Sequence, residues 1–181
     1  MFSDFSKHYP PFLEFIPICM LIFAWSYAFG QYANLPDVIP THFGFNGMPD
    51  DWSNKGFVSV YLLPLIATLV YLMDFGINIA VIKSKDPRKF INLPIAKNVV
   101  LDTKTLELIR TAVVRFMYAM NLLITLLFAY LTYTTIQTGL GNANGVNSVL
   151  LFIIIGALLV LTVWFTVKIS RLQKTSIITK K

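Results

Sequence analysis

The sequence predicts an all-α integral membrane protein with four transmembrane helices, and three observations lead to this fold class. Hydrophobic residues make up 56% of the 181 residues and charged residues 13%, whereas a typical soluble domain is about 25% charged. Four apolar segments each approach or exceed the roughly 20 residues that a helix needs to cross a bilayer. Most lysines and arginines lie between or after these segments. We therefore expect the excess apolar surface to face lipid.

The first two spans are predicted at residues 12–31 and 57–82. The first is too long and too aromatic for a signal-peptide core, and no small-residue cleavage site follows it, so we expect a retained helix. Pro17 and Pro64 fall inside these spans, where prolines are tolerated if neighbouring helices satisfy the freed carbonyls. Asp74 is the one charged residue of the second span. Asn78 lies four residues later and therefore on the same helical face.

The second half of the chain alternates basic and apolar segments. A connector at residues 83–110 carries seven lysines and arginines, and Pro87 and Pro94 interrupt any long helix there. Asp102 or Thr103 is expected to cap a helix that continues into a third span at residues 111–133. An uncharged turn at residues 137–147 leads to a fourth span at residues 149–167. The tail at residues 168–181 has five basic residues and no acidic one.

The distribution of positive charge predicts the orientation. If the amino terminus is cytoplasmic, the inner segments hold thirteen of the fifteen lysines and arginines, and the loop at residues 35–56 holds only Lys55. The positive-inside rule then places both termini in the cytoplasm and this loop outside. The net charge of +6 is thus expected to set topology. Nucleic-acid binding, which needs a basic face on a folded domain, is not expected.

Two charges lie within predicted spans. Asp74 and Arg115 come from consecutive antiparallel helices at matched depth, about 8–12 Å from the cytoplasmic boundary at 1.5 Å per residue. We hypothesise that they form an ion pair. The alternative is that Arg115 extends to the inner headgroups while Asp74 is protonated or bonded to Asn78 or Tyr118. Either arrangement favours a role in packing and registry, because a proton or ion pathway needs more polar relays.

The 35–56 loop is the long polar interruption of the first eighty residues, and it is predicted to form a structured cap. Pro36 and Pro40 stiffen an extended segment. Asn46-Gly47 is a strong turn signal for a short hairpin, and Pro49 limits the return strand to an irregular edge. The loop's aromatic residues are expected at the outer membrane interface: Phe43, Phe45 and Trp52.

Three interpretations of His42 remain open. In the first, His42 bonds Asp50 or Asp51 and fixes the loop. In the second it belongs to a binding surface for a peptide or partner, and in the third it forms a metal or catalytic site with Asp37, Asp50 or Asp51. A single histidine with a few carboxylates is a weak match to zinc sites, which use three or four ligands. The sequence contains no phosphate loop or histidine pair at metal-binding spacing. An enzyme is therefore disfavoured, and no cofactor is expected.

The loop resembles a small uncharacterised membrane domain with the pattern LP-x-x-IP-x-H-aromatic, then G-x-PD, then an aromatic residue and lysine. This domain is best known from the SdpI-type bacterial toxin-immunity proteins. The resemblance implies a multi-spanning membrane protein of bacteria or archaea, protection from a secreted peptide toxin, and membrane sequestration of a small repressor. It rests on these residues of the present chain: Leu35, Pro36, Asp37, Ile39, Pro40, His42, Phe43, Asn46, Gly47, Pro49, Asp50, Trp52 and Lys55.

Together these observations predict a non-enzymatic membrane protein of the prokaryotic cell membrane whose 35–56 loop is the recognition element. The expected partners are the lipid bilayer, an extracellular peptide and a cytoplasmic regulatory partner. The alternative is a membrane-embedded enzyme or small transporter in which the loop binds a metal. Cys19 is the single cysteine, so no intrachain disulfide can form, and because it lies in an apolar run a buried, inert thiol is expected.

Overall fold

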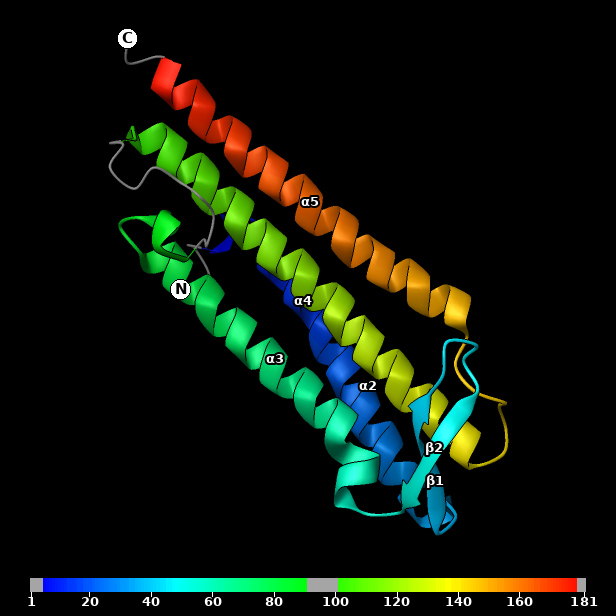
Figure 1. Cartoon of the computed structure of the whole chain (residues 1–181). Helices are drawn as coiled ribbons and strands as arrows, with labels where there is room; N and C mark the ends of the chain where they lie inside the picture. Colours follow the sequence, from blue (N-terminus) through cyan, green and yellow to red (C-terminus); the bar gives the residue numbers. More distant parts are fainter. Residues whose placement is uncertain (1–4, 91–100, 179–181) are drawn as a thin grey trace. The chain divides into compact units, whose positions relative to one another are not determined.

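The computed structural model describes residues 5–90 and 101–178, and within them the chain is helical apart from one two-stranded hairpin (Figure 1). Residues 91–100 of the predicted connector, including Pro94, and residues 179–181 of the predicted tail lie outside the described residues. The elements in order are η1 (Pro11–Glu14), α2 (Phe15–Gln31), η2 (Tyr32–Asn34), β1 (Val38–Phe43), β2 (Pro49–Asn54), α3 (Phe57–Lys83), η3 (Pro87–Phe90), α4 (Thr103–Gly139) and α5 (Ser148–Ile178).

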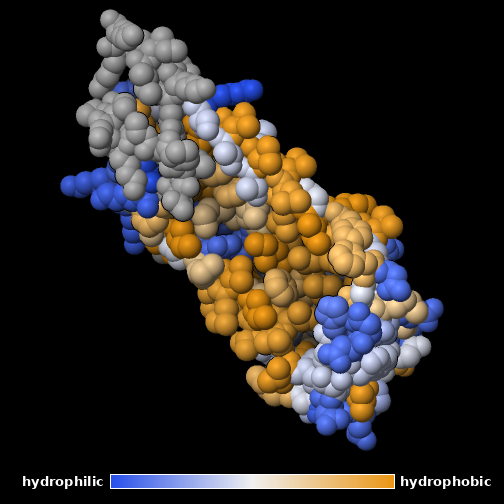
Figure 2. Space-filling model, viewed as in Figure 1, coloured by the Kyte–Doolittle hydropathy of each residue, from blue (hydrophilic) through white to orange (hydrophobic). Residues whose placement is uncertain are grey.

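Four helical segments are long and apolar enough to cross a membrane, which confirms the predicted fold class. They cover residues 11–34, 57–83, 103–139 and 148–172. Figure 2 shows apolar residues over the helical surface and polar residues gathered over the two strands. In α5 only 11% of the span is buried inside the protein. Most of its apolar side chains therefore face outward, as expected for a helix surrounded by lipid.

Side-chain caps fix where the long helices begin and end. Asp102 Oδ1 accepts a hydrogen bond from the Thr105 amide at 2.9 Å, so Asp102 is the predicted cap of α4. Asn147 Oδ1 accepts from the Leu150 amide in the same way before α5. At the end of α4, Gly141 has a φ of +76°. A glycine adopts this left-handed conformation at no steric cost, and it commonly terminates a helix.

The chain divides into two compact units, and each is built from pieces distant in sequence. The hairpin unit contains residues 14–71 and 121–156, and the connector unit contains residues 1–13, 72–120 and 157–181. Buried aliphatic and aromatic side chains fill each unit. The core of the connector unit includes Val81, Ile109, Val114 and Ile169, each of which is 0% exposed. Each unit thus has its own core.

Candidate functional site

The 35–56 loop folds into the antiparallel hairpin β1–β2. Ile39 pairs with Ser53, Pro40 with Trp52 and His42 with Asp51, and a register shift between Pro40 and His42 marks a bulge. The connecting turn is closed by a hydrogen bond from the Gly44 amide to the Met48 carbonyl at 2.9 Å. Asn46 Oδ1 accepts from the Met48 amide at 3.0 Å, and Gly47 has a φ of +80°. Asn46-Gly47 therefore forms the predicted turn.

One side of the hairpin is buried against helix ends of the same unit. Leu35 and Ile39 are 3% and 1% exposed, and they belong to a cluster with residues of α2, α3 and α4. Gly139, the last residue of α4, has no side chain, and a Cβ there would approach Leu35 to 3.1 Å and Ile39 to 3.4 Å. The hairpin is therefore seated by apolar packing. The helical residues of this cluster are Ala28, Val60, Tyr61 and Ile136.

Lys55 closes the base of the hairpin. Its Nζ donates to the Leu35 carbonyl at 2.7 Å and lies 5.4 Å from the centre of the Tyr32 ring. Its amide also donates to the Asp37 carbonyl at 2.7 Å. A charged donor to a half-buried carbonyl is among the stronger hydrogen bonds in proteins. The one cation of the loop thus joins the two ends of the hairpin.

The outward side carries the residues with titratable groups. His42 Nδ1 and Asp50 Oδ1 lie 2.5 Å apart, as the first interpretation of His42 expects, and both side chains are more than half exposed. Asp51 Oδ1 instead accepts a hydrogen bond from the Trp52 amide at 2.9 Å. Within residues 5–90 and 101–178, no three histidine, cysteine or acidic side chains are grouped so as to hold a metal ion. The described geometry therefore brings together two of the weak metal candidates, His42 and Asp50, and leaves Asp51 bonded to backbone.

The tip and edge of the hairpin display apolar side chains instead of burying them. Phe45 in the turn is 91% exposed, and Met48 and Trp52 are 49% and 47% exposed. Val38 at the start of β1 is 46% exposed. Exposed aromatic and methionine side chains on a rigid support are typical of interaction surfaces. We call Phe45, Met48 and Trp52 the apolar tip; Val38 lies at the base of the hairpin, opposite Asn54.

The predicted loop residues therefore divide into three groups. Leu35, Ile39, Pro40 and Gly47 are buried and build the hairpin. Phe43, Pro49 and Lys55 are half-buried. His42, Asp50 and Trp52, with Pro36, Asp37 and Asn46, are exposed. Sequence reasoning missed Met48 and Val38 as exposed apolar residues. It also missed that the end of α4 and the turn before α5 contact the hairpin; the signal was Gly139 at the helix end and Gly145 in the turn.

The connector unit contains a second polar arrangement, on one face of α4. His8 Nδ1 lies 2.9 Å from Thr111 Oγ1, Arg115 Nε donates to the His8 carbonyl at 2.7 Å, and Tyr118 donates to the Leu13 carbonyl at 3.1 Å. Positions 111, 115 and 118 are spaced by one helical turn each. This face of α4 therefore holds the segment at residues 5–13.

The predicted ion pair between Asp74 and Arg115 is not formed among the described residues. The guanidinium of Arg115 is bound to the backbone of His8, while Asp74 is 9% exposed. Equal depth along two helices does not determine how each helix is rotated about its axis, so it does not determine whether the two side chains face each other. The N-terminal segment, which sequence spacing could not place, takes the position beside Arg115 that the hypothesis gave to Asp74.

Arg110 is a buried cation that the sequence analysis did not single out. Its Nη1 donates to the Val81 and Ile82 carbonyls at 2.5 and 3.0 Å, and its Nε donates to Glu107 at 3.0 Å. These carbonyls lie in the last turn of α3, where helical hydrogen bonds run out and negative partial charge accumulates. Arg110 therefore caps α3 from α4.

His8 is a buried histidine outside the spans. Burial lowers the pKa of its imidazole below the usual value; Glu107 raises this pKa, and the cations Arg110, Lys7 and Arg115 lower it. The ring is 5% exposed and forms a hydrogen bond with Thr111, as donor or acceptor.

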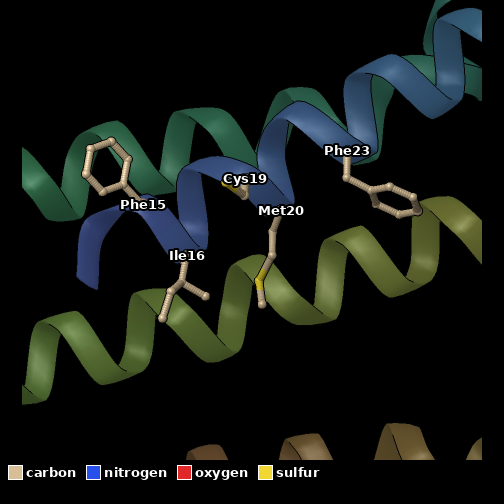
Figure 3. Close-up of a pocket in the computed structure, with 5 residues that line it drawn as sticks. All are labelled: Phe15, Ile16, Cys19, Met20 and Phe23. Atoms are coloured by element: carbon tan, nitrogen blue, oxygen red, sulfur yellow. The ribbon is translucent and has the colours of Figure 1, made fainter. Parts of the chain in front are cut away.

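Helix α2 bears a shallow apolar hollow of about 440 Å³ whose lining contains no polar surface (Figure 3). Phe15, Ile16, Cys19, Met20 and Phe23 line it. Cys19 is exposed there, so the expectation of a buried thiol is wrong. A surface without hydrogen-bonding groups suits an acyl chain and offers no means of orienting a polar substrate. The hollow therefore fits the lipid-facing role expected of this helix.

Comparison with known proteins connects the hairpin to a described domain. A family model described as "Domain of unknown function (DUF1648)" matches residues 19–68, which run from α2 through β1 and β2 into α3. This uncharacterised domain is found in SdpI-like membrane proteins. No curated protein and no solved structure matches the chain.

Proposed function

We propose that this multi-pass membrane protein is a non-enzymatic recognition protein of the SdpI type, in which the hairpin binds an extracellular peptide through its apolar tip. The observation that carries the proposal is the 91% exposure of Phe45 at the turn of a hairpin whose opposite side is firmly seated. A preorganised surface loses little conformational entropy on binding. The match of the domain model to residues 19–68 supports the relationship to SdpI-like proteins.

The charge of the tip favours a cationic partner. Asp37, Asp50 and Asp51 lie in the same loop as a single lysine, and the Lys55 ammonium is engaged at the base of the hairpin. Exposed carboxylates on the same hairpin as exposed aromatic residues complement a peptide that has apolar and basic side chains. Positive-inside topology supports placing this surface outside the cell, since thirteen of fifteen basic residues fall in segments on the other side.

The test is protection of bacteria that lack their own immunity protein, challenged with the cognate secreted peptide toxin of an SdpI-type system. Expression of this chain should raise survival, and Phe45→Asp or Trp52→Asp should remove the protection. Phe57→Ala is the matched control, because Phe57 is 62% exposed at the start of α3 but lies outside the tip.

The proposal fails if the parent chain reaches the membrane and gives no protection. It also fails if the Phe45→Asp variant protects as well as the parent at equal abundance. Bound metal in the purified protein that disappears on His42→Ala would favour the metal-dependent alternative instead.

A further inference from the structure

Two polar side chains of α3 lie in the connector unit without a described partner. Asp74 and Asn78 are 9% and 2% exposed, and the Oδ1 atom of Asn78 is buried with no hydrogen-bond partner. Among the described residues, the structure gives Asp74 neither a hydrogen bond nor an ion pair. A buried acceptor without a donor costs roughly 1–3 kcal/mol. Asp74 and Asn78 are therefore two buried polar side chains, four residues apart, that both lack a described hydrogen-bond partner.

The described hydrogen bonds of the cations and hydroxyls in this unit go to groups other than Asp74. Arg115 binds the His8 carbonyl, and Tyr118 binds the Leu13 carbonyl. Arg110 binds carbonyls of α3 and the carboxylate of Glu107, while His8 bonds Thr111. Among the described residues, none of these groups forms a hydrogen bond or an ion pair with Asp74.

A protonated Asp74 side chain supplies the hydrogen-bond donor that Oδ1 of Asn78 lacks. An ionised carboxylate only accepts hydrogen bonds, whereas a protonated carboxyl has one O–H donor. An unpaired charge within a span costs roughly 2.5–3.5 kcal/mol on insertion scales. Residues four apart on a helix have Cβ atoms about 5–6 Å apart, within reach of a side-chain hydrogen bond.

We propose that Asp74 and Asn78 form a proton-binding site, in which the Asp74 carboxylate takes up one proton and the resulting O–H donates a hydrogen bond to Oδ1 of Asn78. One proton converts the carboxylate to a neutral acid, gives Asn78 its missing donor and removes the buried charge. A bound metal cation is a poorer fit, because it would require more oxygen ligands than these two side chains supply. This inference does not depend on the proposed function of the hairpin.

Infrared spectroscopy of the purified protein in lipid tests the site directly. At neutral pH the parent should show the carbonyl band of a protonated carboxylic acid, and Asp74→Asn should lack it. Asn78→Leu should move the band to higher frequency, because the acid loses its acceptor. Asp50→Asn is the control, since Asp50 is exposed on the hairpin, and it should leave the band unchanged.

Chemical labelling of the parent protein gives an independent measurement that needs no variant to fold. Dicyclohexylcarbodiimide enters lipid and reacts with protonated carboxyl groups, so mass spectrometry should find its adduct at Asp74 and not at the exposed Asp37. An infrared difference spectrum without an acid band overturns the proposal. A carboxylate band that is lost in Asp74→Asn overturns it as well, because Asp74 would then be ionised.

Discussion

Gly47 and Val146 meet backbone to backbone, although ninety-nine residues separate them. The Val146 amide donates to the Gly47 carbonyl at 2.8 Å, which joins the hairpin turn to the segment between α4 and α5. The approach is so close that a Cβ on Gly47 would collide with the Val146 carbonyl oxygen and the Ser148 hydroxyl. Gly47 is therefore required for two reasons, its positive φ and its missing side chain.

Gly47→Ala should destabilise the protein by about 2–5 kcal/mol. The left-handed backbone costs an alanine roughly 1–2 kcal/mol, and forcing extra atoms into packed structure typically adds 1–3 kcal/mol. The measurement is thermal unfolding of the purified protein in detergent. Gly141→Ala is the matched control, because its φ of +76° is nearly the same but a Cβ there meets nothing within 4 Å. Equal losses for the two variants would contradict the described contact.

Lys55→Met should lower stability by about 1.5–3 kcal/mol, the value of a hydrogen bond to a charged group. Methionine keeps much of the side-chain volume but cannot donate to the Leu35 carbonyl at the base of the hairpin. Lys104→Met, at an exposed lysine of α4, should change the unfolding temperature little. If both variants unfold at the temperature of the parent, Lys55 does not hold the base of the hairpin.

His42→Ala should change the free energy of unfolding by no more than about 1 kcal/mol, despite the short contact with Asp50. The side chains are 67% and 53% exposed, and solvent screens such pairs strongly. A loss of toxin protection in this variant, with unfolding unchanged, would then report on recognition. A large drop in unfolding temperature would instead show that the pair is structural.

Stability should fall as the pH drops from about 6.5 towards the lowered pKa of His8. Burial lowers this pKa in the folded protein, so the unfolded chain, with a value near 6.5, binds more protons in that window. Above about pH 6.5 the contribution of neutral His8 to the free energy of unfolding is fully present. Below the lowered pKa of the folded protein this contribution no longer changes with pH. Unfolding temperatures of the parent and His8→Gln, measured from pH 7.5 to 5, should show a steeper fall for the parent. Parallel curves would contradict the burial of neutral His8.

Phe45→Cys in a Cys19→Ser background should react with a membrane-impermeant maleimide added to intact cells. Cys19 is the single native cysteine, so the new thiol is the one site of labelling, and residue 45 is highly exposed. Lys104→Cys in the same background should react only after the cells are permeabilised. The reverse pattern would place the hairpin in the cytoplasm, and the proposed recognition of an extracellular peptide would be wrong.

Local signals in the sequence were sufficient for the turn and the caps. Asn46-Gly47 places the turn because positive φ is accessible to few residues, and Asp102 caps α4 because its side chain reaches the amide of Thr105. No local pattern in the sequence predicts where the segment at residues 5–13 lies. It depends on three side chains of α4 that bind its backbone or His8, and those contacts cross more than one hundred residues of sequence.

The sequence by itself determined the four apolar helices and the hairpin between the first two, because lipid demands long runs of apolar residues and a turn demands particular backbone angles. Only the tertiary structure decided which polar groups meet. It gave Arg115 to the His8 carbonyl and set Gly47 against Val146. The reason is physical: periodicity fixes the face on which a residue lies, while the packing of separate segments fixes what that face touches.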